Sequence, residues 1–161
     1  MKMLFIPGLV AGASGVTLIA QSKTELQGAW QLIEVTRTGE NAGTNTHPQP
    51  GLIIFTEKYY SWIRVDSDQP RPEMPADSSK ASRAEVVAAW GPFTANSGTY
   101  EISGQTLTIH PTIAKDPAVM RTGNAKMFTV VRDGNTLTLT QIRSFRGLIA
   151  NPTTFKLTRV D

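Results

Sequence analysis

Apolar and polar residues alternate along several short segments of the chain, a period-two pattern typical of strands with one buried face. Residues 106–109, 136–139 and 154–158 show it most clearly, with leucine, isoleucine or phenylalanine on one side and threonine or lysine on the other. Because neighbouring side chains point to opposite faces of a sheet, we expect the apolar set of each segment to point into a shared core.

The same pattern, interrupted by glycine, proline, asparagine and aspartate, predicts eight strands joined mostly by local turns. Asp133-Gly134 is the strongest hairpin signal among these turns. Residues 80–93 instead place alanine, valine and tryptophan at helical spacing after Ser79 or Ser82 as N-cap. The strands are expected at 28–37, 52–56, 59–65, 98–103, 106–113, 125–132, 135–143 and 153–160.

These elements define the predicted fold class, which is all-β. An antiparallel meander of eight strands can close into an up-and-down barrel that holds one small ligand, and closure removes exposed strand edges. We therefore expect an eight-stranded antiparallel up-and-down barrel, with one short helix inserted between strands 3 and 4.

Composition narrows the class of protein further. A chain of 161 residues with 40% hydrophobic residues is expected to form one domain. The net charge of +3 is small, and the basic residues are scattered, so we expect no nucleic-acid partner. The chain has no cysteine, which excludes disulfides and thiolate chemistry but leaves the redox compartment open.

The N-terminal residues differ from the rest. Lys2 precedes an apolar run over residues 4–20 that is interrupted by glycine and proline, and small residues follow at Ala20-Gln21-Ser22. This order is typical of a secretory signal peptide over residues 1–22; the alternatives are an apolar N-terminal arm or a buried helix. We expect a barrel over residues 23–161, with no stable membrane span after processing. If the segment is cleaved, the protein is secreted or periplasmic.

A glycine and a tryptophan, Gly28-Ala29-Trp30, open the first predicted strand, and Arg159 lies near the end of the last. Glycine permits a close backbone approach, and an arginine can lie across an indole as a cation–π lid. This arrangement resembles the closed end of the lipocalin (calycin) barrel.

Further segments match in order from about Leu26 to the C-terminus: Leu26-x-Gly28-x-Trp30-x-Leu32, Gly51-Leu52-Ile53, Gly98-Thr99-Tyr100-Glu101 before Ser103-Gly104, and Leu157-Thr158-Arg159-Val160. The chain is similar to the bacterial and fungal lipocalin-like domain proteins. It departs from them at Glu57-Lys58, where an Asp-Gly-type turn is common, and at His110, which stands alone where relatives often show a pair. The resemblance implies a small calycin barrel with a cavity and a long flap, here residues 38–50, over its mouth; it implies no common enzyme activity.

Aromatic residues in the predicted strands are the leading candidates for ligand contacts, although barrel core is their default interpretation. Arg64 and Arg143 lie in predicted strands, and the guanidinium of either can bind a carboxylate with two parallel hydrogen bonds. The alternative is that both arginines lie at the rim of the barrel and contact solvent. The predicted ligand-binding residues are Phe55, Trp62, Tyr100, His110, Phe128 and Arg143.

The two histidines, His47 and His110, are too few for an ordinary zinc site, so we expect no metal. A single histidine can ligate haem in some calycin barrels, and His110 is the better candidate for this role, but we expect no cofactor. Strict alternation faces His110 outward unless Pro111 marks a bulge. Nucleophile, phosphate-loop and dinucleotide motifs are absent from the sequence, and catalytic residues stay unknown.

Three functions remain open. The first is a module that binds a small, largely apolar molecule in the barrel, which a completely filled interior would exclude. The second is an isomerase, cyclase or hydratase on such a molecule, which a cavity-facing His110 beside a carboxylate would favour. The third is a structural or interaction domain with a filled barrel, which an exposed apolar patch outside the barrel would favour. The sequence leaves the oligomeric state open.

Overall fold

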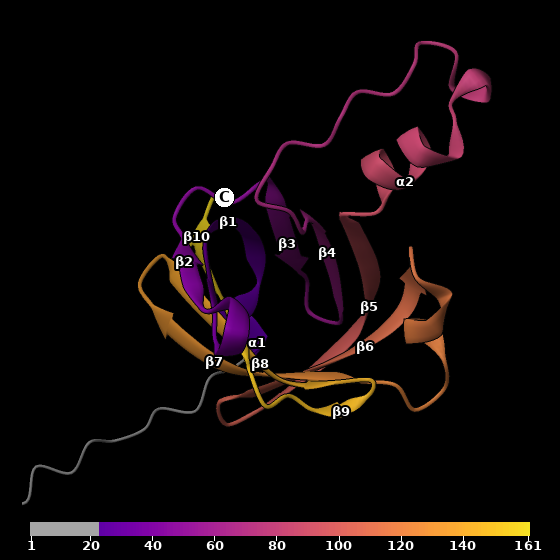
Figure 1. The fold of residues 1–161 in the computed structure, drawn as a ribbon. Coiled ribbons are helices and arrows are strands. Elements are labelled where there is room, and N and C mark those ends of the chain that lie inside the picture. The colour runs from indigo at the N-terminus through magenta and orange to yellow at the C-terminus, as the bar shows by residue number, and fades with distance from the viewer. Residues whose placement is uncertain (1–22) are drawn as a thin grey trace, which may run out of the picture.

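Eight antiparallel strands form a closed barrel in the computed structural model, which describes residues 23–161 (Figure 1). The predicted signal peptide over residues 1–22 lies outside the described residues. Neighbouring strands pair in chain order, and the last pairs with both the strand before it and the first, which closes the barrel. The barrel strands are β1 (Gly28–Arg37), β3 (Gly51–Phe55), β4 (Tyr59–Val65), β5 (Phe93–Ser103), β6 (Thr106–Ala114), β7 (Lys126–Asp133), β8 (Thr136–Ser144) and β10 (Thr153–Arg159).

The all-β prediction, the number of barrel strands and the helix between strands 3 and 4 are confirmed. The largest difference is at β5, which begins at Phe93 rather than at residue 98. The elements outside the barrel are short. They are α1 (Lys23–Leu26), α2 (Arg83–Trp90), β2 (Gly43–Asn45), β9 (Gly147–Leu148) and the 3-10 turns η1 (Gly39–Asn41), η2 (Ser78–Lys80) and η3 (Pro117–Met120).

The two ends of the barrel differ in their connections. Tight turns at residues 56–58, 104–105 and 134–135 join strands at one end, which α1 and the C-terminus also cover; we call it the closed end. The long connections lie at the other, open end: residues 38–50, 66–92, 115–125 and 145–152. The resemblance predicts a flap for the first of these connections. Its strand β2 pairs with the last three residues of β1 and extends the barrel wall there.

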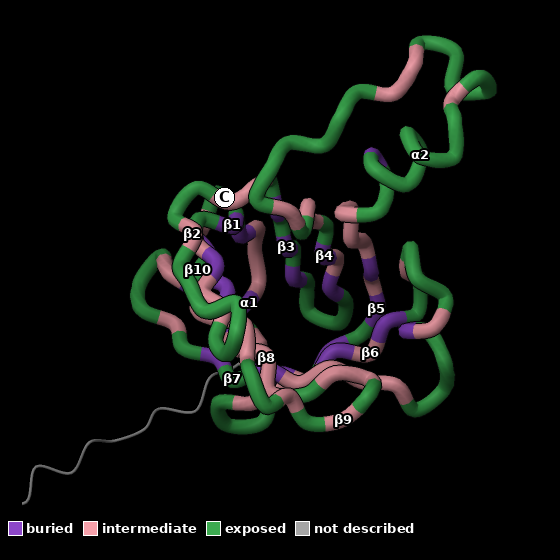
Figure 2. Tube along the Cα trace, in the orientation of Figure 1, coloured by how far each residue is buried: buried purple, intermediate pink, exposed green. Residues whose placement is uncertain are grey.

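The core follows the alternation of the strands. Buried residues line the inside of the barrel, whereas the connections at the open end are mostly exposed (Figure 2). Apolar side chains fill the closed end and the middle of the barrel, and within residues 23–161 the one buried polar residue is Asn96. Burial of this apolar surface is the main stabilising contribution to the fold.

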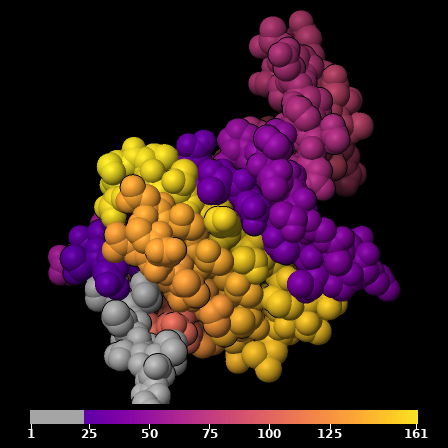
Figure 3. Space-filling view, turned by 90° about the vertical axis from the view of Figure 1, so that its left-hand side faces the viewer, coloured from indigo at the N-terminus to yellow at the C-terminus, as the bar shows by residue number. Residues whose placement is uncertain are grey.

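The long connection that carries α2 stands away from the barrel (Figures 1 and 3). Ser82 begins the helix with a capping box, in which its hydroxyl accepts from the Glu85 backbone N–H and Glu85 reaches back to Ser82. Of its residues only Ala89 is buried, and Trp90 is 50% exposed and contacts Phe93 edge-on at 5.8 Å between ring centroids. The helix is therefore held mainly at its C-terminal end.

The closed end is sealed by the predicted pair of Trp30 and Arg159. The guanidinium lies 5.3 Å from the indole centroid, and its Nη2 donates to the Gln27 carbonyl at 2.8 Å. Trp30 Nε1 donates to the Leu26 carbonyl at 2.8 Å, so the buried indole N–H is satisfied. Gly28 has a φ of +126°, and a Cβ there would lie 2.8 Å from the Asp161 carboxylate oxygens. Only glycine fits this conformation and this approach.

Candidate functional site

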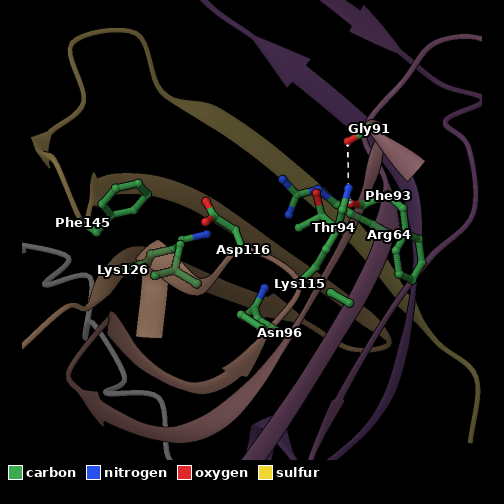
Figure 4. Close-up of a pocket in the computed structure, with 12 residues that line it drawn as sticks. Arg64, Gly91, Phe93, Thr94, Asn96, Lys115, Asp116, Lys126 and Phe145 are labelled. Carbon is green, nitrogen blue, oxygen red and sulfur yellow. Dashed lines mark hydrogen bonds between the residues drawn. The ribbon is translucent and has the colours of Figure 1, made fainter. Parts of the chain in front are cut away.

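A pocket of about 380 Å³ lies at the open end of the barrel (Figure 4). It is bounded by the inner faces of β4 to β7, by η3 and by the turn between β8 and β9. Polar and apolar groups share its wall. The lining residues are Arg64, Gly91, Phe93, Thr94, Ala95, Asn96, Ala114, Lys115, Asp116, Val119, Lys126 and Phe145.

Arg64 comes from the inner face of β4, because it continues the alternation of the buried Tyr60 and Trp62. Its side chain is 14% exposed, and its guanidinium lies 5.1 Å from the ring centroid of Trp62 and 4.8 Å from that of Phe155. Its Nη2 donates to Asp66 at 3.3 Å. Burial lowers the pKa of Arg64, and Asp66 partly opposes this effect. The guanidinium still stays charged, because arginine does not lose its proton in proteins.

Lys126 reaches the same pocket from the first residue of β7, on the inner face that continues with Phe128 and Val130. It has no ion pair within the described residues. Burial is the main cause that lowers the pKa of Lys126, and the charge of Arg64 adds to it, whereas Asp116 acts in the opposite direction. The two cations therefore already repel each other across the pocket.

Two other charged residues of the pocket have structural partners. The Lys115 ammonium donates to the carbonyl oxygens of Trp90, Gly91 and Phe93, the last at 2.8 Å, and so ties the end of α2 to the barrel. The Asp116 carboxylate accepts from the Ala118 backbone N–H at 2.9 Å and begins η3. Arg64 and Lys126 are therefore more available to a ligand than Lys115 and Asp116.

Asn96 supplies an uncharged polar group on the inner face of β5. Its Oδ1 accepts from the Tyr60 hydroxyl at 2.6 Å, which satisfies a buried phenol, and burial raises the pKa of Tyr60. With its oxygen occupied in this way, the amide of Asn96 offers mainly its N–H groups to the pocket.

The predicted aromatic residues all lie in the core below this pocket. Trp62 and Phe128 are 5.4 Å apart between ring centroids and, with Phe155, form the layer directly under Arg64. Phe55 and Tyr100 pack edge-on at 5.0 Å closer to the closed end. The sequence-predicted aromatics therefore form the floor and the core, and none of them lines the pocket.

His110 and Arg143 lie elsewhere. His110 is opposite the exposed Thr99 and between the buried Ile109 and Pro111, so it faces outward, as strict alternation predicts; the bulge in β6 comes after it, at Thr112. Arg143 was expected in the cavity, but it is exposed and pairs with Met127, an outward residue of β7.

Lys126 and Asn96 were not predicted from the sequence. Lys126 lies two residues before Phe128, so extending the alternation by one step would have found it. Asn96 was missed because β5 was expected to begin at residue 98.

Residues 23–161 hold neither a metal-binding cluster nor a membrane-spanning helix. Within this range, no three His, Cys, Asp or Glu side chains are grouped so that they could hold a metal ion. None of the helices described here has the length and apolarity needed to cross a membrane.

The outside of the barrel carries an exposed apolar strip. Leu52 and Ile63 face each other across β3 and β4, and a shallow groove beside them is lined in part by Ile54, Tyr59 and Ile113. These five residues, which we call the outer strip, are between 37% and 71% exposed. Single exposed apolar residues are ordinary, but a contiguous group is typical of an interaction surface.

Comparison with known protein families identifies the family of this chain. A family model described as a lipocalin-like domain matches residues 27–155. The crystal structure of a lipocalin-like protein from Bacteroides uniformis ATCC 8492 resembles this chain with a TM-score of 0.46 and 16% identity, over 84% of this chain and 99% of that one. No curated protein matches the chain. Because the family model spans most of the barrel, the chain belongs to the lipocalin-like domain family.

Proposed function

We propose that this protein is a binding module that holds a small molecule in the pocket at the open end of its barrel. The observation that carries the proposal is the pocket itself, a space of about 380 Å³ whose wall is shared by apolar and polar side chains. Ligand sites in proteins have this size, and in them apolar contacts supply affinity while convergent polar groups fix orientation. The interior is filled below Arg64, so the ligand is expected at the mouth rather than along the barrel axis.

The polar groups support binding rather than stability. Trp62 Nε1 and Arg64 Nε are buried and have no hydrogen-bond partner among the described residues. Buried donors without acceptors cost free energy, and native proteins keep few of them. Arg64 lines the pocket and Trp62 lies directly beneath Arg64, so a bound molecule would change the surroundings of both.

The test uses matched tryptophan substitutions on one strand. Thr94 lies on the pocket wall, and Thr99 lies on the outer face of the same β5. Native mass spectrometry of the full chain, purified from its own host, is expected to show a bound mass that denaturation releases. Thr94→Trp should abolish this mass by filling the pocket, and Thr99→Trp should retain it. A bound mass that survives Thr94→Trp would contradict the proposed site, and an apo protein that binds no probe from a small-molecule panel would contradict the function.

The enzyme alternative gains no support from the pocket. Its discriminating feature is a cavity-facing His110 beside a carboxylate, and His110 faces outward, with no hydrogen bond from its imidazole to any described residue. The carboxylate that does line the pocket, Asp116, is engaged as the cap of η3.

The outer strip supports a second function, which is self-association. The outward residues of β3 and β4 carry no charge, so two copies of this chain can place these faces together without opposing like charges. Ile63→Lys puts a charge within the strip, whereas Val131→Lys puts one at a similarly exposed site on β7. In sedimentation velocity we expect a dimer for the wild type and for Val131→Lys, and a monomer for Ile63→Lys. A monomeric wild type at high concentration would contradict self-association.

A further inference from the structure

The pocket at the open end has more positive than negative charge on its wall. Arg64, Lys115 and Lys126 line it, against the single carboxylate of Asp116. Because Lys115 and Asp116 are held by backbone groups, the two cations without full compensation are Arg64 and Lys126. They come from β4 and β7, which are three strands apart in an eight-stranded barrel, so they approach the pocket from different sides (Figure 4).

The acids near Arg64 neutralise it only in part. Asp66 contacts Arg64 at 3.3 Å, but it also contacts Arg37 at 3.6 Å and is 49% exposed. Asp68 pairs with Arg37 at 3.5 Å and has no ion pair with either pocket cation. Asp66 is therefore shared between two arginines and screened by solvent, and it does not line the pocket.

The guanidinium of Arg64 also has unused donors. Its Nη2 donates to Asp66, and neither Nε nor Nη1 has a hydrogen-bond partner among the described residues. Stacking on Trp62 and Phe155 fixes the plane of the group, so little side-chain entropy remains to be lost when a ligand binds.

We propose, on the basis of the function proposed above, that the ligand is an organic acid. Its anionic group lies against Arg64 and Lys126, and its apolar body contacts Phe93, Val119 and Phe145. An anion between two partly buried cations forms charge-assisted hydrogen bonds and removes their mutual repulsion, which a neutral ligand of the same shape cannot do.

The titration of Lys126 points in the same direction. Burial and the charge of Arg64 both lower the pKa of Lys126, so its charged form is held there at a cost. A bound carboxylate would raise this pKa again. The ligand therefore supplies the negative charge that the pocket wall lacks.

The position of Arg64 also sets the orientation and size of the acid. Arg64 covers the aromatic floor, so the anionic group enters first and the apolar body points toward the mouth. A volume of about 380 Å³ is near the lower limit for ligand pockets, which favours a compact acid over a long-chain one.

The experiment compares acids with their own amides. Isothermal titration of the full chain with matched pairs, such as 3-phenylpropanoate and 3-phenylpropanamide, keeps the apolar body constant and changes only the charge. We expect the acid to bind about tenfold to hundredfold more tightly than the amide, the range that one or two charge-assisted hydrogen bonds supply. Arg64→Met and Lys126→Met should each reduce this preference, and the double variant should abolish it.

Two control variants remove the same charges outside the pocket. Arg143→Met and Lys156→Met lie at exposed positions of β8 and β10, and we expect both to keep the preference for the acid. Equal binding of acid and amide, abolished by Thr94→Trp, would overturn this inference and leave the proposed function standing. Absence of Thr94-dependent binding for every acid and amide would overturn both.

A second measurement reports on Lys126 itself. In a protein labelled with ¹³C at lysine, NMR titration follows the pKa of the Lys126 side chain. The acid is expected to raise that pKa toward the ordinary value of 10.5, and the amide to leave it unchanged. An acid that binds without moving the pKa of Lys126 would overturn the assignment of its anionic group to this pair.

Discussion

The barrel contains two stacks of an arginine on a tryptophan, one at each end, and they differ in how their donors are used. At the closed end Arg159 lies 5.3 Å from Trp30, and at the open end Arg64 lies 5.1 Å from Trp62. In the closed-end stack, Trp30 Nε1, Arg159 Nη2 and Arg159 Nε all donate to acceptors at 2.8–3.0 Å. In the open-end stack, Trp62 Nε1 and Arg64 Nε have no acceptor in the described part of the chain.

This difference shows that residue type alone does not separate a structural site from the proposed binding site. Both stacks bury an aromatic ring beneath a cation, which contributes to stability wherever it occurs. Only the closed-end stack also has an acceptor for each of these donors, from Leu26, Gln27 and Asp161. The open-end stack lies beneath long connections that leave a pocket, and its two buried donors stay without an acceptor among the described residues.

Replacing the two tryptophans gives the largest expected effects. Trp30→Phe removes packing volume and leaves the Leu26 carbonyl without its donor, so we expect the free energy of unfolding to fall by about 2–4 kcal/mol. Trp62→Phe removes similar volume but only an unpartnered N–H, so its loss should be smaller by about 1–2 kcal/mol. Equilibrium unfolding in urea measures both. Equal losses would mean that the hydrogen bond of Trp30 contributes nothing.

Replacing the two arginines gives smaller effects, which differ between the two ends of the barrel. Arg159→Met removes a cation–π contact and hydrogen bonds, and we expect it to cost about 1–3 kcal/mol. Arg64→Met removes a partly buried charge and leaves Asp66 with Arg37, so we expect a change within about 1 kcal/mol, or a gain in stability. Thermal and urea unfolding check the pair. A large loss for Arg64→Met would make that residue structural.

The fold was predictable because its signals are local. The alternation around Leu107, Leu137 and Phe155 sets the inner face, and turns such as Asp133-Gly134 set the order of the strands. The closed-end pair was predictable too, because a glycine before the tryptophan marks a close approach. These features depend on neighbouring residues in sequence or on a family pattern.

The candidate site was harder to predict because strand boundaries and one strand irregularity decide which residues lie in it. Counting in twos from Leu139 places Arg143 inside the barrel. The register with β7 shifts between Met127 and Phe128, however, so one extra residue of β8, Ile142, turns Arg143 outward. Bulges of this kind leave little trace in the sequence, and a single one reverses every later residue on the strand. Arg64 lies on a regular strand, so its inward position agrees with simple alternation.

The smallest expected effect concerns the pH dependence of stability. It is specific to the open end of the barrel, because Lys126 lies there. The pKa of Lys126 is lower in the folded state than the ordinary 10.5, so the unfolded chain binds more protons between the two values. The cost of charging Lys126 is therefore fully present at neutral pH, and it is relieved as pH rises toward 10.5. We expect Lys126→Met to be more stable than the wild type at neutral pH, by a margin that shrinks across this alkaline range.

The difference between the two proteins isolates this effect from other titrations. Burial raises the pKa values of Tyr60 and Tyr100, which lowers stability at high pH in both proteins alike and cancels in the comparison. Urea unfolding at several pH values measures the margin, with Lys156→Met as the exposed control that should show no such change. A stability difference that does not change with pH would contradict the inference that charging Lys126 in the folded protein costs free energy. If the margin shrinks as expected, a saturating acid should reverse it at neutral pH, because the bound anion stabilises the charged wild type and not the variant.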